Sequence, residues 1–226
     1  MHKIKTRNEI PELLNELKLE GVGVEVGTQT GKFSEVILNK SHLNILWSID
    51  CWEHQEGYED IANHGNWRQK YYHLKTIWRL DKFGDRSKII KAYSKDIPKE
   101  YNYLNELDFV YIDADHTYEG CKEDLEIWYS RVKKGGVLAG HDYFNGDIDE
   151  CKNCGVKKAV DEFMTKHNEK IHTTLEDNPK SWYVIKGGNS KEEMIEISDG
   201  KKFGMSEGSL EAEKYLNKIK GDKNGK

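Results

Sequence analysis

The chain has 226 residues, 36% of them hydrophobic, and a formal net charge of −5 at pH 7. This length suits one domain with a full core, and no apolar run approaches the roughly 20 residues of a membrane span. Acidic and basic residues are interspersed, which argues against a nucleic-acid groove built on bulk charge. Because Met1–Lys5 leads into polar sequence rather than an apolar signal region, we expect a cytoplasmic protein without a nucleic-acid or membrane partner.

Strand and helix patterns alternate along the chain. An amphipathic helix is predicted from about Glu9 to Leu19. Short apolar runs, typical of strands buried on both faces of a parallel sheet, follow at Val22–Val26, Ile45–Ile49, Ile89–Tyr93, Phe109–Ile112 and Val137–Ala139. Apolar stripes at helical spacing pass through Cys121, Leu125, Trp128 and Val132, and through Val156, Ala159, Val160, Phe163 and Met164.

The last predicted strands are Ile171–Leu175 and Ser181–Ile185. The five residues between them are too few for a helical crossover, so we expect an antiparallel hairpin. Beyond Gly187 the sequence is polar and rich in charge. We therefore predict a domain over residues 1–187 and a flexible tail over 188–226, with a frayed helix around Leu210–Ile219.

Cys151 and Cys154 are the one cysteine pair with the spacing of metal ligands. Structural zinc would need two more ligands, and His167 and His172 are the nearby candidates. We expect a solvated loop with two reduced thiols, with a zinc site as the alternative.

The most informative stretch runs from Val24 to Ser34, where an apolar strand meets Glu25, Gly27 and Gly31 before a helix. The glycines would let the backbone turn sharply and approach a ligand, and the helix presents unpaired N–H groups. The turn lacks the G-x-G-x-x-G pattern of dinucleotide sites, and a carboxylate at Glu25 would repel a phosphate but suit a cationic or hydroxyl-bearing ligand. A purely structural turn is the alternative.

Asp50 ends the second predicted strand. In an open α/β sheet, an acidic residue about 20 residues after the glycine turn can accept both hydroxyls of a ribose. The same position fits a nicotinamide dinucleotide. An Asp that caps the following helix is the structural alternative.

Ionisable residues follow two neighbouring predicted strands. Asp113, Asp115 and His116 come directly after one strand, and His141 and Asp142 come after the next. Parallel strands would bring the two groups together at the carboxyl edge of the sheet, where ligands bind in open α/β folds. Structural alternatives are a helix cap for Asp115 and a satisfied, partly buried imidazole for His141.

Several motifs occur in order: the glycine turn, the run from Asp50 to Asp60, and the runs IDADHTYEG, KKGGVLAGHDY and GVKKAVDEF. Together they resemble class I S-adenosylmethionine-dependent methyltransferases, in particular the family that includes sugar, macrolide-sugar and glycan-linked O-methyltransferases. The resemblance covers about Val22 to Ile185. It implies an α/β, Rossmann-like fold whose seven-stranded, mostly parallel sheet ends in the antiparallel hairpin and carries helices on both faces.

The resemblance also implies a cofactor site. S-adenosylmethionine would be bound by Glu25, Gly27, Thr28, Gly31, Ser34, Asp50, Cys51, Ser94, Lys95 and Asp113. A serine at the position of Ser94 contacts the adenine edge in small-molecule O-methyltransferases of this kind. A plain helix N-cap is the alternative for Ser94.

Metal-dependent relatives hold magnesium at positions that match Asp113, His141 and Asp142. Magnesium prefers oxygen ligands, so the imidazole of His141 departs from the pattern, and manganese or iron would tolerate it better. In several relatives a basic residue three positions after the first Asp removes the substrate proton, and here that residue is His116. An imidazole, whose unperturbed pKa is about 6.5, suits this role, so His116 and Asp113 are the predicted catalytic residues.

The aromatic segment from Trp52 to Trp67 is predicted to close over the acceptor, with Trp52, Tyr58 and Tyr143 as substrate contacts. Packing of individual aromatic rings onto the domain is the alternative. The expected reaction is methyl transfer to a hydroxyl of a sugar, glycan or other small molecule, with magnesium or manganese as the candidate metal and a homo-oligomer as a compatible state. An NAD-dependent oxidoreductase and a non-catalytic S-adenosylmethionine-binding protein are the other hypotheses.

Overall fold

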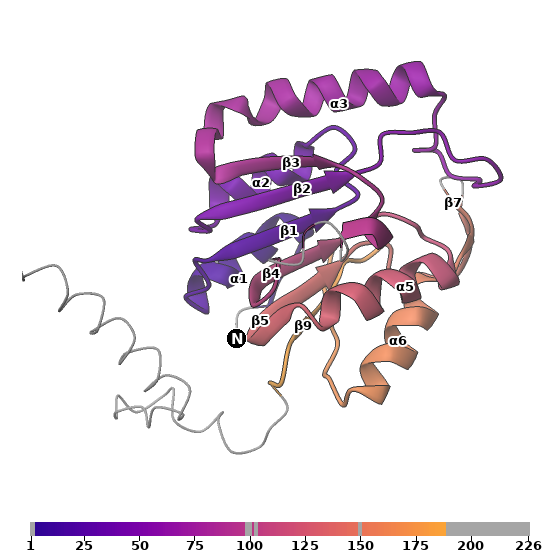
Figure 1. The fold of residues 1–226 in the computed structure, drawn as a ribbon. Coiled ribbons are helices and arrows are strands. Elements are labelled where there is room, and N and C mark those ends of the chain that lie inside the picture. The colour runs from indigo at the N-terminus through magenta and orange to yellow at the C-terminus, as the bar shows by residue number, and fades with distance from the viewer. Residues whose placement is uncertain (1–2, 98–100, 102–103, 149–150, 189–226) are drawn as a thin grey trace, which may run out of the picture. The chain divides into compact units, whose positions relative to one another are not determined.

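The computed structural model describes residues 3–97, 101, 104–148 and 151–188. These residues form a seven-stranded sheet in the order β3-β2-β1-β4-β5-β9-β8 (Figure 1). The strands are β1 (Val22–Val26), β2 (Ile45–Asp50), β3 (Ser87–Lys91), β4 (Leu107–Ile112), β5 (Val132–Gly140), β8 (His172–Thr173) and β9 (Trp182–Ile185). Strands β1 to β5 pair in parallel, and β9 pairs antiparallel with β5 and β8. The predicted sheet and its closing hairpin are confirmed.

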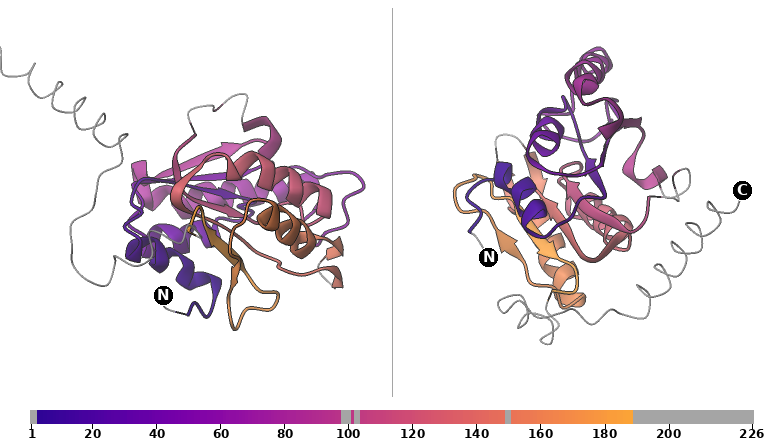
Figure 2. Two further views of the ribbon diagram at one scale, coloured as in Figure 1. Left: turned by 90° about the horizontal axis from the view of Figure 1, so that it is seen from below. Right: turned by 90° about the vertical axis from the view of Figure 1, so that its left-hand side faces the viewer.

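Helices cover both faces of this sheet, as predicted (Figures 1 and 2). They are α1 (Ile10–Glu16), α2 (Lys32–Lys40), α3 (Asn66–Leu80), α5 (Tyr118–Tyr129) and α6 (Val156–Lys166), with short 3-10 helices η1 (Arg7–Glu9), η2 (Asp81–Arg86) and η3 (Ser94–Asp96). Strand β4 is buried at every residue. Its Phe109 and Tyr111 pack in the layer of α1 and α2, whereas Val110 and Ile112 pack in the layer of α5 and α6. Burial on both faces explains the continuous apolar runs.

Several predicted boundaries differ from the structure, three of them informatively. Helix α1 is shorter than predicted and is preceded by η1. Strand β3 begins and ends two residues earlier than predicted, because it is an edge strand that pairs only with β2 and tolerates polar residues. Val132, predicted on the helical stripe, starts β5 instead, since α5 ends at Tyr129.

A second antiparallel pair, β6 (Gly146–Ile148) and β7 (Cys151–Cys154), was not predicted. The solvated loop expected here is wrong for Cys154, which is buried with its thiol 3.5 Å from the backbone oxygen of Phe144. The ring of His167 stacks on Phe163, and that of His172 stacks on another aromatic side chain. Among the described side chains, no cluster of zinc-type ligands forms around Cys154.

The described residues belong to one compact unit. The predicted tail over 188–226 lies outside the described residues apart from Gly188, and so does the helix expected around Leu210–Ile219. In the part of the chain that the structure describes, no helix is both long and apolar enough to cross a bilayer.

Candidate active site

A cavity of about 470 Å³ lies where strands β1, β2 and β4 end. This volume is within the roughly 300–1,000 Å³ typical of small-molecule sites. Most of the predicted cofactor-binding residues line it, namely Glu25, Gly27, Thr28, Asp50, Cys51, Ser94, Lys95 and Asp113. Of the predicted substrate contacts, Tyr58 lines the cavity, whereas Trp52 and Tyr143 do not.

The glycine turn has the conformation that its sequence predicts. Gly27 has a φ of +88°, and a Cβ there would lie 1.9 Å from the backbone oxygen of Asp113. Gly31 has a φ of +70° and forms the N-cap of α2. Only glycine adopts both conformations without strain, so the turn brings the backbone of β1 against that of β4. Gly31 shapes this turn without lining the cavity.

Glu25 is buried at the end of β1. Its carboxylate accepts hydrogen bonds from the hydroxyls of Ser34 and, at 3.4 Å, of Thr28. Burial raises the pKa of Glu25 to about 8. Ser34 is itself fully buried and also contacts Ser48 at 3.0 Å, so it holds Glu25 in place from behind rather than facing the cavity.

Replacing Glu25 with glutamine should make the stability of the fold less dependent on pH. The native state keeps a proton on Glu25 between its usual pKa of 4.5 and about 8, whereas the unfolded state releases it. This stabilisation is complete below pH 4.5 and is lost as the pH rises through about 8. Urea unfolding of both proteins at mildly acidic and mildly alkaline pH checks the prediction. An exposed control, Glu56→Gln, should keep the wild-type slope, and an unchanged slope in Glu25→Gln would contradict the argument.

Asp50 is held rigidly at the cavity wall. Its two carboxylate oxygens accept from the backbone N–H groups of Gln29 at 2.8 Å and Trp52 at 2.7 Å. Burial raises its pKa. The indole of Trp52 donates to the backbone oxygen of Gln29 at 2.7 Å and stacks on His73, with ring centroids 4.3 Å apart. Trp52 thus supports the turn around Asp50, which is the packing alternative considered for this residue.

Ser94 lies in the cavity wall as the first residue of η3, which Tyr93 precedes as N-cap. Its hydroxyl accepts from the indole N–H of Trp128 at 2.8 Å and hydrogen-bonds Asp124. The N-cap alternative for Ser94 is therefore wrong. Asp124, whose pKa burial raises to about 7, also lines the cavity and was not found from the sequence.

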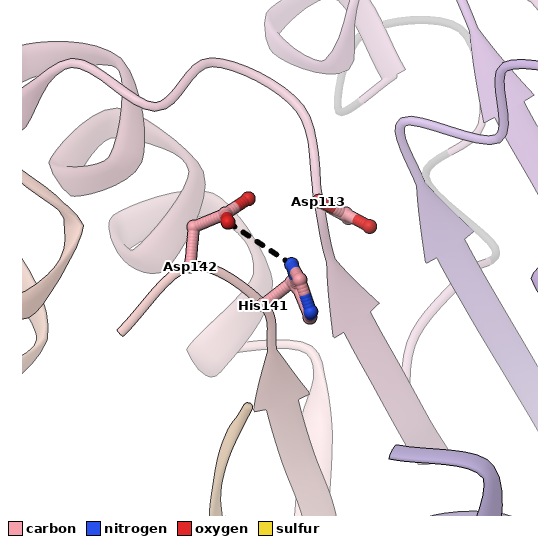
Figure 3. A group of neighbouring side chains, drawn as sticks. All are labelled: Asp113, His141 and Asp142. Carbon is pink, nitrogen blue, oxygen red and sulfur yellow. Dashed lines mark ion pairs between the residues drawn. The ribbon is translucent and has the colours of Figure 1, made fainter. Parts of the chain in front are cut away.

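The three predicted metal ligands meet at the ends of β4 and β5. One ligand atom from each of Asp113, His141 and Asp142 lies within 4.8 Å of the others (Figure 3). Nδ1 of His141 is 3.1 Å from a carboxylate oxygen of Asp142. Burial opposes the charged form of His141, but Asp142 and Asp113 together raise its pKa. The two ends of neighbouring strands thus build one cluster, as predicted.

His116 joins this cluster to the loop over residues 51–65. Its Nε2 lies 3.0 Å from Asp142 and 3.4 Å from Asp113, and its Nδ1 lies 3.0 Å from Asp60. Burial works against the charge of Asp113, but His116, His141 and Arg7 hold the pKa of its carboxyl below the usual value. Both ring nitrogens of His116 therefore face carboxylates.

Asp60 was missed because it lies 56 positions from His116 in the sequence. Tyr58, in the same loop, accepts from the backbone N–H of His116 at 3.2 Å and donates to the backbone oxygen of Ala114 at 3.4 Å. The loop thus closes over the cluster. Tyr143 instead hydrogen-bonds Asp161, away from the cavity lining.

Arg7 is a third residue, after Asp124 and Asp60, that the sequence analysis missed. Its guanidinium lies 3.2 Å from the carboxylate of Asp113 and over the ring of Phe33, 5.1 Å from the centroid. The backbone N–H of Arg7 donates to Asp177 at 2.6 Å, which ties the N-terminal segment to the turn between β8 and β9. No local pattern marks Arg7, because 106 positions separate it from Asp113.

Asp115 is not the helix cap considered for it, because Thr117 caps α5, but it has a structural contact. Its carboxylate accepts from the backbone N–H of Thr117 at 2.8 Å. Thr117 is the N-cap of α5, and its hydroxyl accepts from the backbone N–H of Gly120 at 3.1 Å. Asp115 therefore orders the turn that leads from the cluster into α5.

Solved structures share this fold at low sequence identity. An O-methyltransferase from Bacillus cereus, solved in complex with SAH, has a TM-score of 0.57 at 14% identity, with 80% of each chain covered. TomG, an O-methyltransferase from Streptomyces achromogenes involved in tomaymycin synthesis and solved with SAM, has a TM-score of 0.52 at 12% identity, again over 80% of each chain. These similarities show a Rossmann-like methyltransferase fold.

Sequence comparison identifies the family. An uncharacterized protein of Acanthamoeba polyphaga mimivirus is 30% identical over 126 residues, which are 53% of this chain and 50% of that protein. The chain thus spans about half the length of this curated relative. A family model described as a methyltransferase domain matches residues 24–143, which is more than half of the 226 residues. The matched residues run from within β1 to just past His141 and Asp142. The chain therefore belongs to this methyltransferase domain family.

Proposed function

We propose that this protein is an S-adenosylmethionine-dependent O-methyltransferase in which His116 is the general base. The acceptor is a hydroxyl of a sugar, glycan or other small molecule. One observation carries the proposal: His116 stands at the cavity with Nδ1 against Asp60 and Nε2 toward the cluster of Asp113 and Asp142.

The cavity suits the cofactor in charge and shape. Asp50 places a carboxyl group in its wall, and Glu25 adds a second one whose pKa is about 8; both suit a ligand with hydroxyl groups, and neither suits a phosphate. Gly27 lines the same wall and lets the backbone of β1 pack directly against that of β4, which shapes this end of the cavity. When bound, S-adenosylmethionine supplies a methyl group on a positively charged sulfur, so the acceptor oxygen gains a carbon bond as the carbon–sulfur bond breaks.

The residues around His116 suit it to remove the proton of the acceptor hydroxyl. Asp60 accepts the hydrogen bond from Nδ1, which selects the tautomer with its lone pair on Nε2 and stabilises the imidazolium that forms. Nε2 lies next to Asp113 and Asp142. A cation bound to these two carboxylates would reduce their attraction for a proton on Nε2. The lone pair of Nε2 could then accept the proton of the acceptor hydroxyl.

The cluster of Asp113, His141 and Asp142 has side chains that suit a divalent ion. Asp113 and Asp142 offer oxygens and His141 offers a nitrogen, a donor set that suits manganese or iron better than magnesium. Arg7 contacts only one oxygen of Asp113, so the other remains in the cluster. An ion held there would lower the pKa of the acceptor hydroxyl.

Cofactor identity is tested by calorimetry with S-adenosylmethionine, S-adenosylhomocysteine and NAD. We expect binding of the first two and no measurable affinity for NAD. Asp50→Ala should weaken binding by about 10²-fold, since each hydrogen bond to a charged group contributes about 1.5–3 kcal/mol. The exposed carboxylate Asp85 provides the control, Asp85→Ala, which should bind as wild type does. Tighter binding of NAD would support the oxidoreductase instead, and an unchanged affinity in Asp50→Ala would show that the ribose is held elsewhere.

A further inference from the structure

Helix α3 buries mostly polar side chains and exposes large hydrophobic ones. The side chains that it buries against the domain are Gln69, Thr76 and Leu80, two of which are polar. Its solvent side carries most of the large hydrophobic residues that are exposed in the described part of the chain, namely Trp67, Tyr71, Leu74, Ile77 and Trp78. Trp67 and Trp78 are 74% and 79% exposed. Large apolar surfaces of this kind mark interaction sites.

Trp67, Tyr71, Leu74 and Trp78 form one stripe, because their spacing of four, three and four residues returns to the same side of a helix. Figure 1 shows α3 on the outside of the molecule beside the edge strand β3. We call this stripe, together with the neighbouring Ile77, the aromatic face of α3.

Cationic residues border the aromatic face. At about 100° per residue, Lys70 lies on one side of the stripe, and Arg68 and Lys75 lie on the other. The guanidinium of Arg68 lies 5.5 Å from the ring centroid of Trp67, and the ammonium of Lys75 lies 5.8 Å from that of Tyr71. The sequence from Asn66 to Leu80 contains no acidic residue. The face therefore combines apolar surface with positive charge.

The positive charge around the aromatic face indicates which kind of partner binds there. A second copy of the same face would bring like charges together, so the cations disfavour a symmetric contact between two α3 helices. Aromatic and aliphatic side chains flanked by Lys and Arg instead match the boundary between the acyl chains and anionic headgroups of a bilayer. We propose that α3 docks the protein on the surface of a membrane that contains anionic lipids.

In the docked state the aromatic face enters the headgroup region, and Arg68, Lys70 and Lys75 contact lipid phosphates. This proposal replaces our expectation that the protein has no membrane partner, and it does not depend on the proposed enzyme activity. Gln69 of α3 and Ile61 of the preceding loop both line the cavity, and Ile61 is also 61% exposed. Docking through α3 thus places lipid against a helix whose buried side borders the cavity.

The test is co-sedimentation of the full chain with vesicles of phosphatidylcholine alone or mixed with phosphatidylglycerol. We expect stronger binding to the mixed vesicles and weaker binding as salt rises, because salt screens the cationic residues. Binding should also shift tryptophan fluorescence to shorter wavelength, because Trp67 and Trp78 are exposed. Equal binding to both vesicles, or none to either, would overturn the proposal.

Variants separate the aromatic and cationic contributions. Trp67→Ser with Trp78→Ser should weaken binding to mixed vesicles by about tenfold or more. Lys70→Glu with Lys75→Glu should weaken it by about fivefold or more for each lysine removed. The matched controls are Leu175→Ser, at an exposed hydrophobic residue off the helix, and Lys122→Glu, at an exposed lysine on α5; both should bind as wild type does.

Sedimentation of the protein without lipid distinguishes membrane binding from self-association through the aromatic face. Wild type and the double tryptophan variant should have the same oligomeric state, and circular dichroism should show both folded. A wild-type oligomer that the double tryptophan variant loses, together with no vesicle binding, would assign the aromatic face to contacts between copies and overturn the membrane proposal.

Discussion

Replacing His116 with alanine should lower turnover by about 10²-fold or more while the affinity for S-adenosylmethionine stays near wild type. In the proposed reaction the imidazole acts on the reacting hydroxyl, and the carboxyl groups of Glu25 and Asp50 in the cavity wall are untouched by the change. Steady-state kinetics with labelled S-adenosylmethionine gives kcat and KM, and calorimetry gives the cofactor affinity. The loss should appear in kcat.

Two further variants sharpen this result. Asp60→Asn keeps the size of the side chain but removes the charge beside Nδ1 of His116, so it should lower kcat by less than His116→Ala does. His54→Ala, an exposed histidine of the same loop, should leave kcat unchanged. Full turnover by His116→Ala would show that another group takes the proton.

Chelation of divalent metal should abolish turnover, and Asp142→Ala should reproduce that loss. In the proposed reaction both changes would remove an ion that would lower the pKa of the acceptor hydroxyl, an effect worth several kcal/mol in metal-assisted reactions. Assay after dialysis against a chelator, followed by titration with manganese or magnesium, measures the requirement. We expect manganese to restore more activity than magnesium because His141 offers a nitrogen.

The ligand set itself provides the control. His141→Asn exchanges the nitrogen for an amide oxygen, which should move the preference toward magnesium. Asp85→Ala, at an exposed carboxylate on η2, should keep the wild-type metal response. Undiminished activity in the presence of chelator would rule out the metal role, and an active His116→Ala, Asp142→Ala double variant would remove the basis of the proposed reaction.

The central sheet could be predicted from the sequence because its inner strands are buried on both faces. Strand β4 is covered on both faces, so its run is apolar at every position except Asp108. Edge elements carry no such signal. Strand β3 uses Ser87 and Lys88, and β7 contains Lys152 and Asn153, because one side of each meets solvent or a single partner.

The positions of the residues at the centre of the site could also be predicted from the sequence. Asp113 and the pair His141 and Asp142 follow neighbouring parallel strands, and parallel pairing brings the ends of such strands together without further information. Gly27 was assigned from the sequence to a sharp turn that approaches a ligand; the turn is present, but the group that it approaches most closely is the backbone of β4.

Packing across long sequence separations decided the rest. Arg7 and Asp60 reach the cluster from the N-terminal segment and from a loop, so no spacing or periodicity connects them with Asp113 or His116. The orientation of α3 has the same origin. Its apolar stripe is a local property of the sequence, but the stripe points to solvent because Gln69 and Thr76 fill the contact with the domain, and that contact exists only in the folded chain.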